Sequence, residues 1–566
     1  MPTEKNLTGY PSIDKPWLKY YTEEAINSKT PKCSIYQNIY DGNADHLSDV
    51  ALLFFGKKFT YKQLFAEIDK AAKAFVASGV QWGENVVLCM PAIPETIYAI
   101  LALNKIGANA VMLNPLFTEE QLIARISETD AKLMVVVNEL YERVENVIPR
   151  TAVKKVVSCA AVNSLGAIIK LIKKAKTIPG TTAWNNFLKQ GRGINLIVPE
   201  YEPKRPAIMV YSSGTTGASK GIQLTNDSIN STITEGVQIG FEWQRGDRWF
   251  SQIPVWFSTG ICAQTLVPLK YGITIILEPV YDFEVFYQHI IKYKPNFMIT
   301  ACGLLDYLMT KQPKAEAYQG FKFLCAGGEY VTPSAEKKYN DWLKSNNNHY
   351  GFFKGYGMCE CGGTVTASSP KSNAVGSAGI PTPNVVVSAF DLETGKECKY
   401  GERGEIRVDS PTRMKGYFNN EKATNDYFYK DKNGVVWGCT GDIGYVDEDG
   451  EVFILGRATD CYYTDDGKRV FQFDIEEVIL QDDSVSDCKV VQTTDKSMIV
   501  AHIILKDGCK QNSSEVISNI HKNCTDKLDD FAIPTHYKIR DSFPVHSNGK
   551  RDNGSLKNDT EDLIVL

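Results

Sequence analysis

The sequence predicts an α/β protein with a large N-terminal domain of mostly parallel, doubly wound sheets, a β-subdomain within it, and a small α+β C-terminal domain. Short apolar strands alternate with amphipathic helices from Ala51 to Leu140 and again from Ile208 to about Gly363, which is typical of a parallel sheet covered by helices. After Ser377 the sequence is rich in strands, glycines and acidic turns, and from about Arg457 onwards it has an independent α+β pattern. A chain of 566 residues also requires more than one domain, because single cores stop growing near roughly 250–300 residues.

The first alternating stretch can be divided into individual elements. We expect strands over residues 51–56, 85–90, 108–113 and 131–137, and helices over residues 59–79, 94–107 and 119–130. Thr60 is the expected N-cap of the first helix, because its hydroxyl can accept a hydrogen bond from an N–H group of the first turn. Gly79 is its expected C-cap, because glycine adopts the left-handed conformation that ends many helices.

The composition excludes several classes of protein. The hydrophobic fraction of 43% and the charged fraction of 23% are ordinary for a globular protein, and a formal charge of -5 gives no basic footprint for nucleic acid. The fourteen cysteines include no CxxC pair that could begin a zinc or redox site, so we interpret them as reduced thiols of a cytoplasmic protein. We expect neither a secretory signal nor a membrane span, since the N-terminus has no apolar segment and no apolar run reaches roughly 18–20 residues.

One segment, residues 165–176, interrupts the alternation. It places four apolar residues on one helical face with lysines between them: Leu165, Ile168, Ile169 and Ile172. Two interpretations remain open, a surface helix packed on the sheet or a basic amphipathic segment in peripheral contact with a membrane.

The strongest local signal is the string YSSGTTGASKG, from Tyr211 to Gly221, which directly follows an apolar strand. Its glycines allow the backbone to approach a ligand closely, and its N–H and hydroxyl groups can converge on an anion. Lys220 adds a positive charge near the end of the string. The GxxxxGK[ST] spacing of a Walker A loop is absent, so the string indicates a phosphate-binding loop of another kind.

This string resembles the phosphate-binding motif of the AMP-forming adenylating superfamily, which comprises acyl-CoA synthetases, aryl-CoA ligases, beetle luciferases and peptide-synthetase adenylation domains. The chain is most similar to acyl-CoA synthetases, and the resemblance covers nearly its whole length. The other motifs follow in the family's order: Thr60 and Tyr61 with residues 107–115, CAGGE ending at Glu329, GYGMCE ending at Glu360, WGCTGD ending at Asp442, Gly456 and Arg457 with Asp460 and Gly467 beyond them, and NGK ending at Lys550.

The resemblance implies the roles of individual residues. Lys220 and the loop donors would hold the β- and γ-phosphates of ATP, Glu360 would bind Mg²⁺, and Lys550 would bridge the attacking carboxylate and the α-phosphate. Carboxylate oxygens suit Mg²⁺, and a contact that stabilises the charge of the transition state is worth about 3–4 kcal/mol. Asp442 and Arg457 would bind the ribose hydroxyls. The nucleotide-binding residues implied are Ser212, Ser213, Gly214, Thr215, Thr216, Gly217, Gly328, Glu329, Tyr356, Gly357, Cys359, Asp442 and Arg457.

The resemblance also implies an acyl pocket. Its mix of glycine, apolar and aromatic residues suits an apolar tail. Trp256, which lies where many relatives have a histidine after a proline, is expected to line or gate it. The implied lining residues are Trp256, Phe257, Gly260, Gly303, Met358 and Gly363.

Two further positions depart from the family pattern. Cys359 replaces the threonine of the YGxTE motif, and because a thiol is a weak donor its contact with the α-phosphate should be weaker. Thr459 replaces an aspartate or lysine at the hinge. With this hinge, the expected domains are residues 1–456, which hold ATP and the acid, and residues 457–566, a mobile domain that carries Lys550.

We therefore expect an AMP-forming acid:CoA ligase that requires ATP, Mg²⁺ and CoA. It would activate a fatty or other apolar carboxylic acid as an acyl-adenylate and transfer the acyl group to CoA. Two alternatives remain open: an adenylation enzyme that loads a carrier-protein thiol, and a weakly active nucleotide-binding relative, which Cys359 and Thr459 suggest. The presence of Lys220, Glu360 and Lys550 argues against the second alternative.

Overall fold

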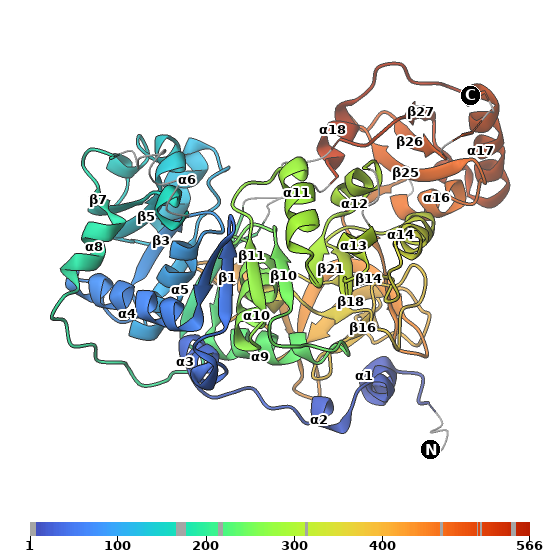
Figure 1. Cartoon of the computed structure of the whole chain (residues 1–566). Coiled ribbons are helices and arrows are strands. Elements are labelled where there is room, and N and C mark those ends of the chain that lie inside the picture. Colours follow the sequence, from blue (N-terminus) through green and yellow to red (C-terminus); the bar gives the residue numbers. More distant parts are fainter. Residues whose placement is uncertain are drawn as a thin grey trace.

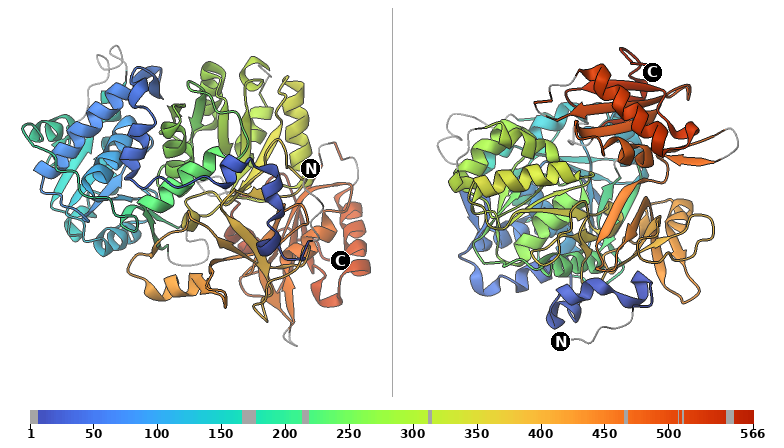
Figure 2. Two further views of the ribbon diagram at one scale, coloured as in Figure 1. Left: turned by 90° about the horizontal axis from the view of Figure 1, so that it is seen from below. Right: turned by 90° about the vertical axis from the view of Figure 1, so that its right-hand side faces the viewer.

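The computed structural model describes the chain except for residues 1–6, 166–176, 213–218, 312–314, 465–467, 507, 510–511 and 545–550. The strands of the described residues form a nine-stranded, an eight-stranded and a five-stranded sheet in the large N-terminal domain, and a three-stranded sheet and a hairpin towards the C-terminus. The C-terminal domain stands out from one corner of the large domain, on the side opposite the N-terminal helices (Figures 1 and 2). This is the α/β architecture that the sequence predicts.

The nine-stranded sheet comprises β1 (Val50–Phe54), β2 (Lys57–Thr60), β10 (Arg248–Ser251), β11 (Thr274–Leu277), β12 (Phe297–Thr300), β13 (Phe323–Gly327), β14 (Phe352–Tyr356), β15 (Thr366–Ala367) and β16 (Ile380–Pro381). Its six central strands are parallel in the order β14-β13-β12-β10-β11-β1, and antiparallel strands complete both edges. Helices α11 (Phe283–Tyr293), α12 (Cys302–Met309) and α14 (Pro333–Ser345) cover one face. Phe286, Leu305 and Leu343 are fully buried there against Phe250 of β10 and its neighbours.

The eight-stranded sheet comprises β3 (Asn85–Cys89), β4 (Asn109–Met112), β5 (Leu133–Val137), β6 (Lys155–Cys159), β7 (Thr182–Ala183), β8 (Pro206–Tyr211), β9 (Gly221–Thr225) and β19 (Gly416–Tyr417). It is parallel from β8 to β7, and β9 and β19 join one edge antiparallel. The helices around it are α4 (Tyr61–Ala77), α5 (Pro94–Ile106), α6 (Glu119–Glu128), α8 (Trp184–Gln190) and α9 (Asn226–Val237).

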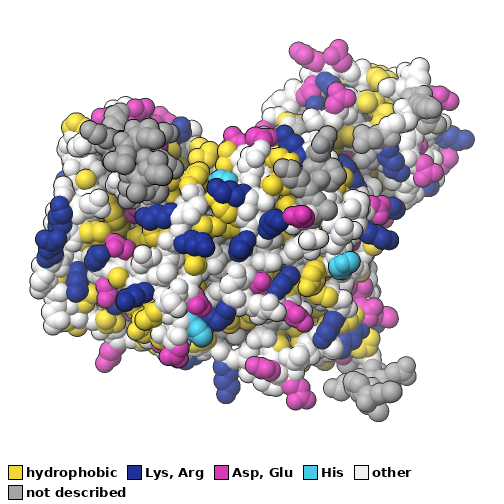
Figure 3. Space-filling model, viewed as in Figure 1, with side chains coloured by type: hydrophobic (Ala, Val, Ile, Leu, Met, Phe, Trp, Pro, Cys, Tyr) yellow, Lys and Arg dark blue, Asp and Glu magenta, His cyan; other side chains and the backbone are white. Residues whose placement is uncertain are grey.

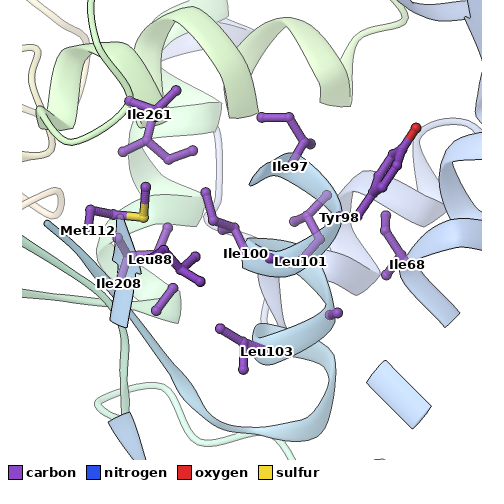
Figure 4. Packing of buried hydrophobic residues seen from close by; sticks show 14 of the residues in the cluster. Ile68, Leu88, Ile97, Tyr98, Ile100, Leu101, Leu103, Met112, Ile208 and Ile261 are labelled. Atoms are coloured by element: carbon purple, nitrogen blue, oxygen red, sulfur yellow. The ribbon is translucent and has the colours of Figure 1, made fainter. Parts of the chain in front are cut away.

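Helix α5 lies in the middle of the main core. All of its residues except Lys105 are buried, as its sequence without a polar stripe predicts. Figure 4 shows Ile97, Ile100 and their neighbours packed between the strand residues Leu88, Met112 and Ile208 and the facing Ile261. This core joins the two large sheets.

The ends of α4 test the cap predictions. Thr60 forms a capping box with Gln63, as predicted. The prediction for Gly79 was one residue off, because the C-cap is Ser78. Gly79 follows it with a φ of 90°, so glycine still supplies the left-handed residue just beyond the helix end.

The five-stranded sheet is the predicted β-subdomain. It consists of β17 (Val386–Phe390), β18 (Gly404–Asp409), β20 (Phe428–Lys430), β21 (Val436–Val446) and β22 (Val452–Arg457) and is entirely antiparallel. Helix α15 (Glu421–Tyr427) precedes β20. Shorter helices of the large domain are α1 (Pro11–Asp14), α2 (Glu23–Ile26), α3 (Ile35–Asp41), α10 (Val267–Lys270) and α13 (Ala315–Tyr318), with a π-helix at Thr259–Leu266.

The C-terminal domain has its own core around β25 (Val485–Gln492), β26 (Ile499–Leu505), β27 (His536–Arg540), α16 (Gln472–Ile479) and α17 (Ser513–Lys527). The hairpin of β23 (Cys461–Tyr463) and β24 (Arg469–Phe471) precedes this core, and α18 (Asn553–Asn558) follows it. The Arg403 guanidinium of the large domain reaches two carboxylates of α16, Asp474 at 2.5 Å and Glu477 at 2.9 Å.

Charges of both signs are interspersed over the face shown in Figure 3. Within the described part of the chain, no helix is both long enough and apolar enough to cross a membrane. Residues 166–176 are outside that part, so the membrane-contact interpretation of this segment stays a prediction. Leu165, just before it, packs against the main core.

Candidate active site

A cavity of about 970 Å³ lies where the two domains meet. It is at the carboxyl ends of β12, β13 and β14, and its lining includes Thr300, Gly327 and Tyr356, the last residues of these strands. Ligands of open parallel sheets bind at such strand ends. The C-terminal domain contributes Lys489 and Arg551 to the lining.

A buried carboxylate occupies one corner of this cavity. Asp442 of β21 and Arg457 of β22 are cross-strand partners, and the guanidinium donates to Asp442 Oδ1 at 2.7 Å. The hydroxyl of Tyr356 donates to the other oxygen, Oδ2. Burial and the neighbouring Asp442 raise the pKa of Tyr356 well above its usual value. Burial acts to lower the pKa of Arg457, but Asp442 outweighs it and the pKa is raised. Two fixed donors therefore hold the side chain of Asp442 at the cavity edge.

A second carboxylate lies in the same cavity. Glu360 follows β14, and its Oε1 accepts a hydrogen bond of 2.8 Å from the Tyr417 hydroxyl. Burial and Glu360 raise the pKa of Tyr417, so this hydroxyl keeps its proton and remains a donor. The Lys220 ammonium lies 4.7 Å from the centre of the Tyr417 ring, where a cation is attracted to the ring face.

The two ends of the Ser/Gly/Thr loop are joined beside Lys220. The Ser212 N–H donates to the Lys220 carbonyl at 3.0 Å, and the Lys220 N–H donates to Ser212 Oγ at 3.0 Å. Both residues line the cavity. The predicted phosphate-binding residues between them, Ser213, Gly214, Thr215, Thr216 and Gly217, lie outside the described residues.

The predicted adenine segment also lines the cavity. Gly328 and Glu329 follow β13, and Glu329 Oε1 accepts a hydrogen bond of 2.6 Å from the N–H of Cys302 at the start of α12. Gly357 and Gly363 line the cavity as well, and their backbones approach so closely that a Cβ at position 357 would lie 2.2 Å from the Gly363 carbonyl oxygen. This contact closes the loop that carries Cys359 and Glu360.

The cavity has two contrasting walls. We define the polar wall by Ser212, Lys220, Tyr356, Glu360, Tyr417, Asp442 and Arg457. We define the apolar wall by six residues of one buried cluster that also line the cavity: Ile239, Trp249, Ile299, Phe323, Cys325 and Ala367. Such a combination of an apolar surface with a few converging polar groups is typical of a small-molecule site.

Two family models match this chain. The model of the AMP-binding enzyme matches residues 41–418, and the model of its C-terminal domain matches residues 474–550. The chain belongs to the AMP-binding enzyme family. The motif resemblance that the sequence showed is thereby confirmed.

The relatives of this AMP-binding enzyme include several CoA ligases. The long-chain-fatty-acid–CoA ligase of Bacillus subtilis is 25% identical over 558 residues, which are 95% of this chain and 96% of that protein. The probable 4-coumarate–CoA ligase 2 of Dictyostelium discoideum is 28% identical over 441 residues, or 75% of this chain and 76% of that protein. ATP-bound MatB from Rhodopseudomonas palustris has the same fold, with a TM-score of 0.78 at 21% identity over 94% of this chain and 99% of that one.

Among the residues that the structure describes, all but three of the predicted site residues of this AMP-binding enzyme line the cavity. Phe257, Met358, Gly363 and Cys359 line the cavity, but Trp256, Gly260 and Gly303 do not. Gly260 is buried, with the carbonyl oxygens of residues 253 and 254 packed where a side chain would be. Gly303 is exposed beside Phe283, and Trp256 packs against the main core. Lys550 lies outside the described residues.

Among the cavity residues that sequence reasoning missed are the apolar wall and three polar residues that the fold adds to the site. Tyr417 is 57 residues from Glu360 in the sequence, and Lys489 and Arg551 come from the C-terminal domain. Arg551 directly follows the predicted Lys550, so the NGK motif could have indicated it. No comparable motif surrounds Tyr417 or Lys489.

Proposed function

We propose that the protein is an ATP-dependent, AMP-forming acid:CoA ligase that activates a carboxylic acid with a mainly apolar tail. The observation that carries this proposal is the presence of the polar and the apolar wall in one cavity at the carboxyl ends of the strands. ATP would lie along the polar wall and the tail of the acid along the apolar wall. The CoA-ligase names of the relatives support this choice among the activities of the family.

In the first step, a carboxylate oxygen of the acid would attack the α-phosphorus of ATP, and pyrophosphate would leave. Lys220 and the loop beside it would hold the phosphates, and Asp442 would accept hydrogen bonds from the ribose hydroxyls while Arg457 and Tyr356 fix its position. Lys550 would neutralise charge at the reacting phosphorus, an effect worth about 3–4 kcal/mol for contacts of this kind. The presence of Arg551, the next residue, in the cavity lining supports this role.

In the second step, the sulfur of CoA would attack the carbonyl carbon of the acyl-adenylate, and AMP would leave. We propose that residues 457–566 form the mobile unit, with the boundary at the end of β22, and that this unit rotates between the steps to present the loop at Gly467 to the thiol. Such rearrangements order catalytic groups one step at a time. The separate core of the C-terminal domain supports a rigid-body movement.

Glu360 is suited to help hold Mg²⁺. Tyr417 donates to one of its carboxylate oxygens, Oε1, which leaves Oε2 for a cation. No group of three or more His, Cys, Asp or Glu side chains in the described part of the chain forms a metal site, and Mg²⁺ in nucleotide enzymes is held by one or two carboxylates together with substrate phosphates. The ion would supply charge neutralisation for the phosphates.

The test is acid-dependent release of AMP, measured with and without CoA, together with mass spectrometry of the thioester. We expect equimolar AMP and acyl-CoA with at least one acid in a panel graded by length and aromaticity, and a loss of activity in a folded Glu360→Gln variant. Thioester formed only on a phosphopantetheinylated carrier protein would favour the carrier-loading alternative. Absence of AMP with every acid would favour the weakly active relative. A cytoplasmic location stays a prediction from the cysteine pattern.

A further inference from the structure

The lining of the cavity shows which part of the C-terminal domain lies at the site. Arg551 and Asn553, which follow the predicted Lys550, both line the cavity. The hairpin of β23 and β24 carries the predicted loop at Gly467, and none of its described residues lines the cavity. On the proposed function, this is the arrangement of the first step, because the segment next to Lys550 lies at the site and the hairpin does not.

Arg403 links the two domains in this arrangement. It lies in the large domain directly before β18. Its Nη1 donates to Asp474 Oδ1 at 2.5 Å, and its Nη2 donates to Glu477 Oε2 at 2.9 Å. Because the guanidinium is a rigid planar fork, two contacts from one group restrict the orientation of α16 as well as its distance from the large domain.

Helix α16 passes this restriction on to the rest of its domain. Asp474 and Glu477 are three residues apart, which places both carboxylates on one face of the helix. Ile475 and Ile479 of the same helix are fully buried in the core of the C-terminal domain. A contact that holds the carboxylates of α16 therefore holds the position of the whole domain.

The exposure of these ion pairs suits contacts that break in every turnover. The side chain of Arg403 is 45% exposed, and those of Asp474 and Glu477 are 38% and 60% exposed. Exposed pairs are individually weak, because water and salt compete with them. The rotation in the proposed function would carry both carboxylates away from Arg403, and weak pairs can favour one arrangement without trapping it.

We propose, on the basis of the proposed function, that Arg403 is a positioning residue for the first step. Its contacts with Asp474 and Glu477 favour the arrangement that brings Lys550 to the cavity. Arg403 itself does not line the cavity, so it acts through the position of the C-terminal domain. Without it, fewer molecules are poised for adenylate formation, and the population poised for thioester formation does not fall.

The test measures the two half-reactions separately in the full-length enzyme. The rate of pyrophosphate release reports the first step, and single-turnover thioester formation from preformed acyl-adenylate reports the second. Arg403→Gln should slow the first step by roughly two- to tenfold and leave the second unchanged or slightly faster. Asp474→Asn combined with Glu477→Gln should have the same effect, and adding Arg403→Gln should cause no further loss, because the contacts are already absent.

Charge reversal separates positioning from a merely structural role. Arg403→Glu places a third carboxylate beside two others and should slow the first step more than Arg403→Gln does. Adding Asp474→Arg and Glu477→Arg should restore the first step to near the wild-type rate. Arg413→Gln is the matched control, since Arg413 and Asp409 form a pair at 2.7 Å with similar exposures of 40% and 36%, but within the large domain. This control should leave both half-reactions unchanged.

Three results would overturn the inference: an unchanged first step in Arg403→Gln, equal losses in both steps, or a loss in Arg403→Glu that the reversed partners do not restore. In each of these cases, AMP and acyl-CoA formed by the wild-type enzyme still support the ligase. Absence of AMP with every acid would overturn the proposed function and this inference together.

Discussion

The polar and the apolar wall of the cavity differ in how the chain builds them. Six residues of the polar wall come from the motifs of the sequence, and hydrogen bonds fix their geometry, as in the pairs Asp442–Arg457 and Glu360–Tyr417. The apolar wall is assembled from single residues of separate elements, such as Ile239 after α9, Trp249 of β10 and Phe323 of β13. Directional contacts require particular residue types, whereas apolar packing accepts many.

This difference predicts that substitutions at the two walls have different effects on the kinetics. On the proposed function, the groups of the polar wall contact parts of the reaction that are common to every acid. Substitutions there should lower the rate by a similar factor whichever acid is supplied. Substitutions at the apolar wall should change the order in which acids are preferred and leave the kinetic constants for ATP nearly unchanged.

The largest effect is expected for Lys550→Ala. Adenylate formation should fall by about 10²–10³-fold with every acid, because the charge at the reacting phosphorus loses its cation. Thioester formation from preformed acyl-adenylate should change much less. Pyrophosphate release and single-turnover thioester formation measure the two steps. Lys522→Ala, an exposed lysine of the same domain, is the control, and equal losses in both steps of Lys550→Ala would contradict the assignment.

A smaller effect is expected for Asp442→Asn. Hydrogen bonds to a charged group contribute about 1.5–3 kcal/mol, so kcat/KM for ATP should fall by about ten- to a hundredfold, equally for long and short acids. Asp409→Asn is the control. Asp409 of β18, in the same sheet, pairs with Arg413 at 2.7 Å, and neither residue lines the cavity. This substitution should leave the ATP kinetics unchanged. If the loss of kcat/KM for ATP in Asp442→Asn depends on which acid is supplied, the polar and the apolar wall do not have separate roles.

Gly236→Leu should change the kinetic constants for the acid and not those for ATP. Gly236 of α9 lines the cavity, and a Cβ there would lie 3.1 Å from Val267 of α10, which also lines it. A leucine should narrow this part of the cavity and lower kcat/KM by roughly tenfold for long tails, with KM for ATP unchanged. Gly303→Leu provides the comparison, because Gly303 is exposed although the sequence predicted it in the acyl pocket. If Gly236→Leu and Gly303→Leu show the same preference among acids of different length, the acyl tail does not lie beside Gly236.

The smallest effect is expected for Cys359→Thr. A hydroxyl is a better donor than a thiol, and one neutral hydrogen bond contributes about 0.5–1.5 kcal/mol, or roughly 2- to 12-fold. The adenylation rate should therefore stay the same or rise modestly, while Cys359→Ala should not raise it. Steady-state pyrophosphate release at saturating ATP measures this. A fall in kcat above about tenfold at unchanged stability would show that the loop between Gly357 and Gly363 is built around sulfur.

The sequence by itself determined the elements and the family motifs. Strand and helix alternation predicted the parallel sheets, Thr60 predicted the start of α4, and the motifs around Glu360 and Asp442 predicted two carboxylates of one site. The prediction for Thr60 succeeds because helix caps need specific side chains at fixed spacings. The roles of Glu360 and Asp442 in phosphate and ribose recognition stay predictions. Gly79 was misplaced by one residue, since the left-handed position follows the last hydrogen-bonded residue.

Only the tertiary structure decided which distant residues complete the site. Tyr417 reaches Glu360 because β19 pairs with β9 beside the loop that ends at Lys220. Gly303 and Trp256 lie outside the cavity, although they adjoin segments that line it. Trp249 could have been any buried core residue, since hydrophobic contacts are not directional and a strand sequence does not specify which neighbours its side chains meet. Its position at the cavity follows from how β10, β12 and β13 pack together.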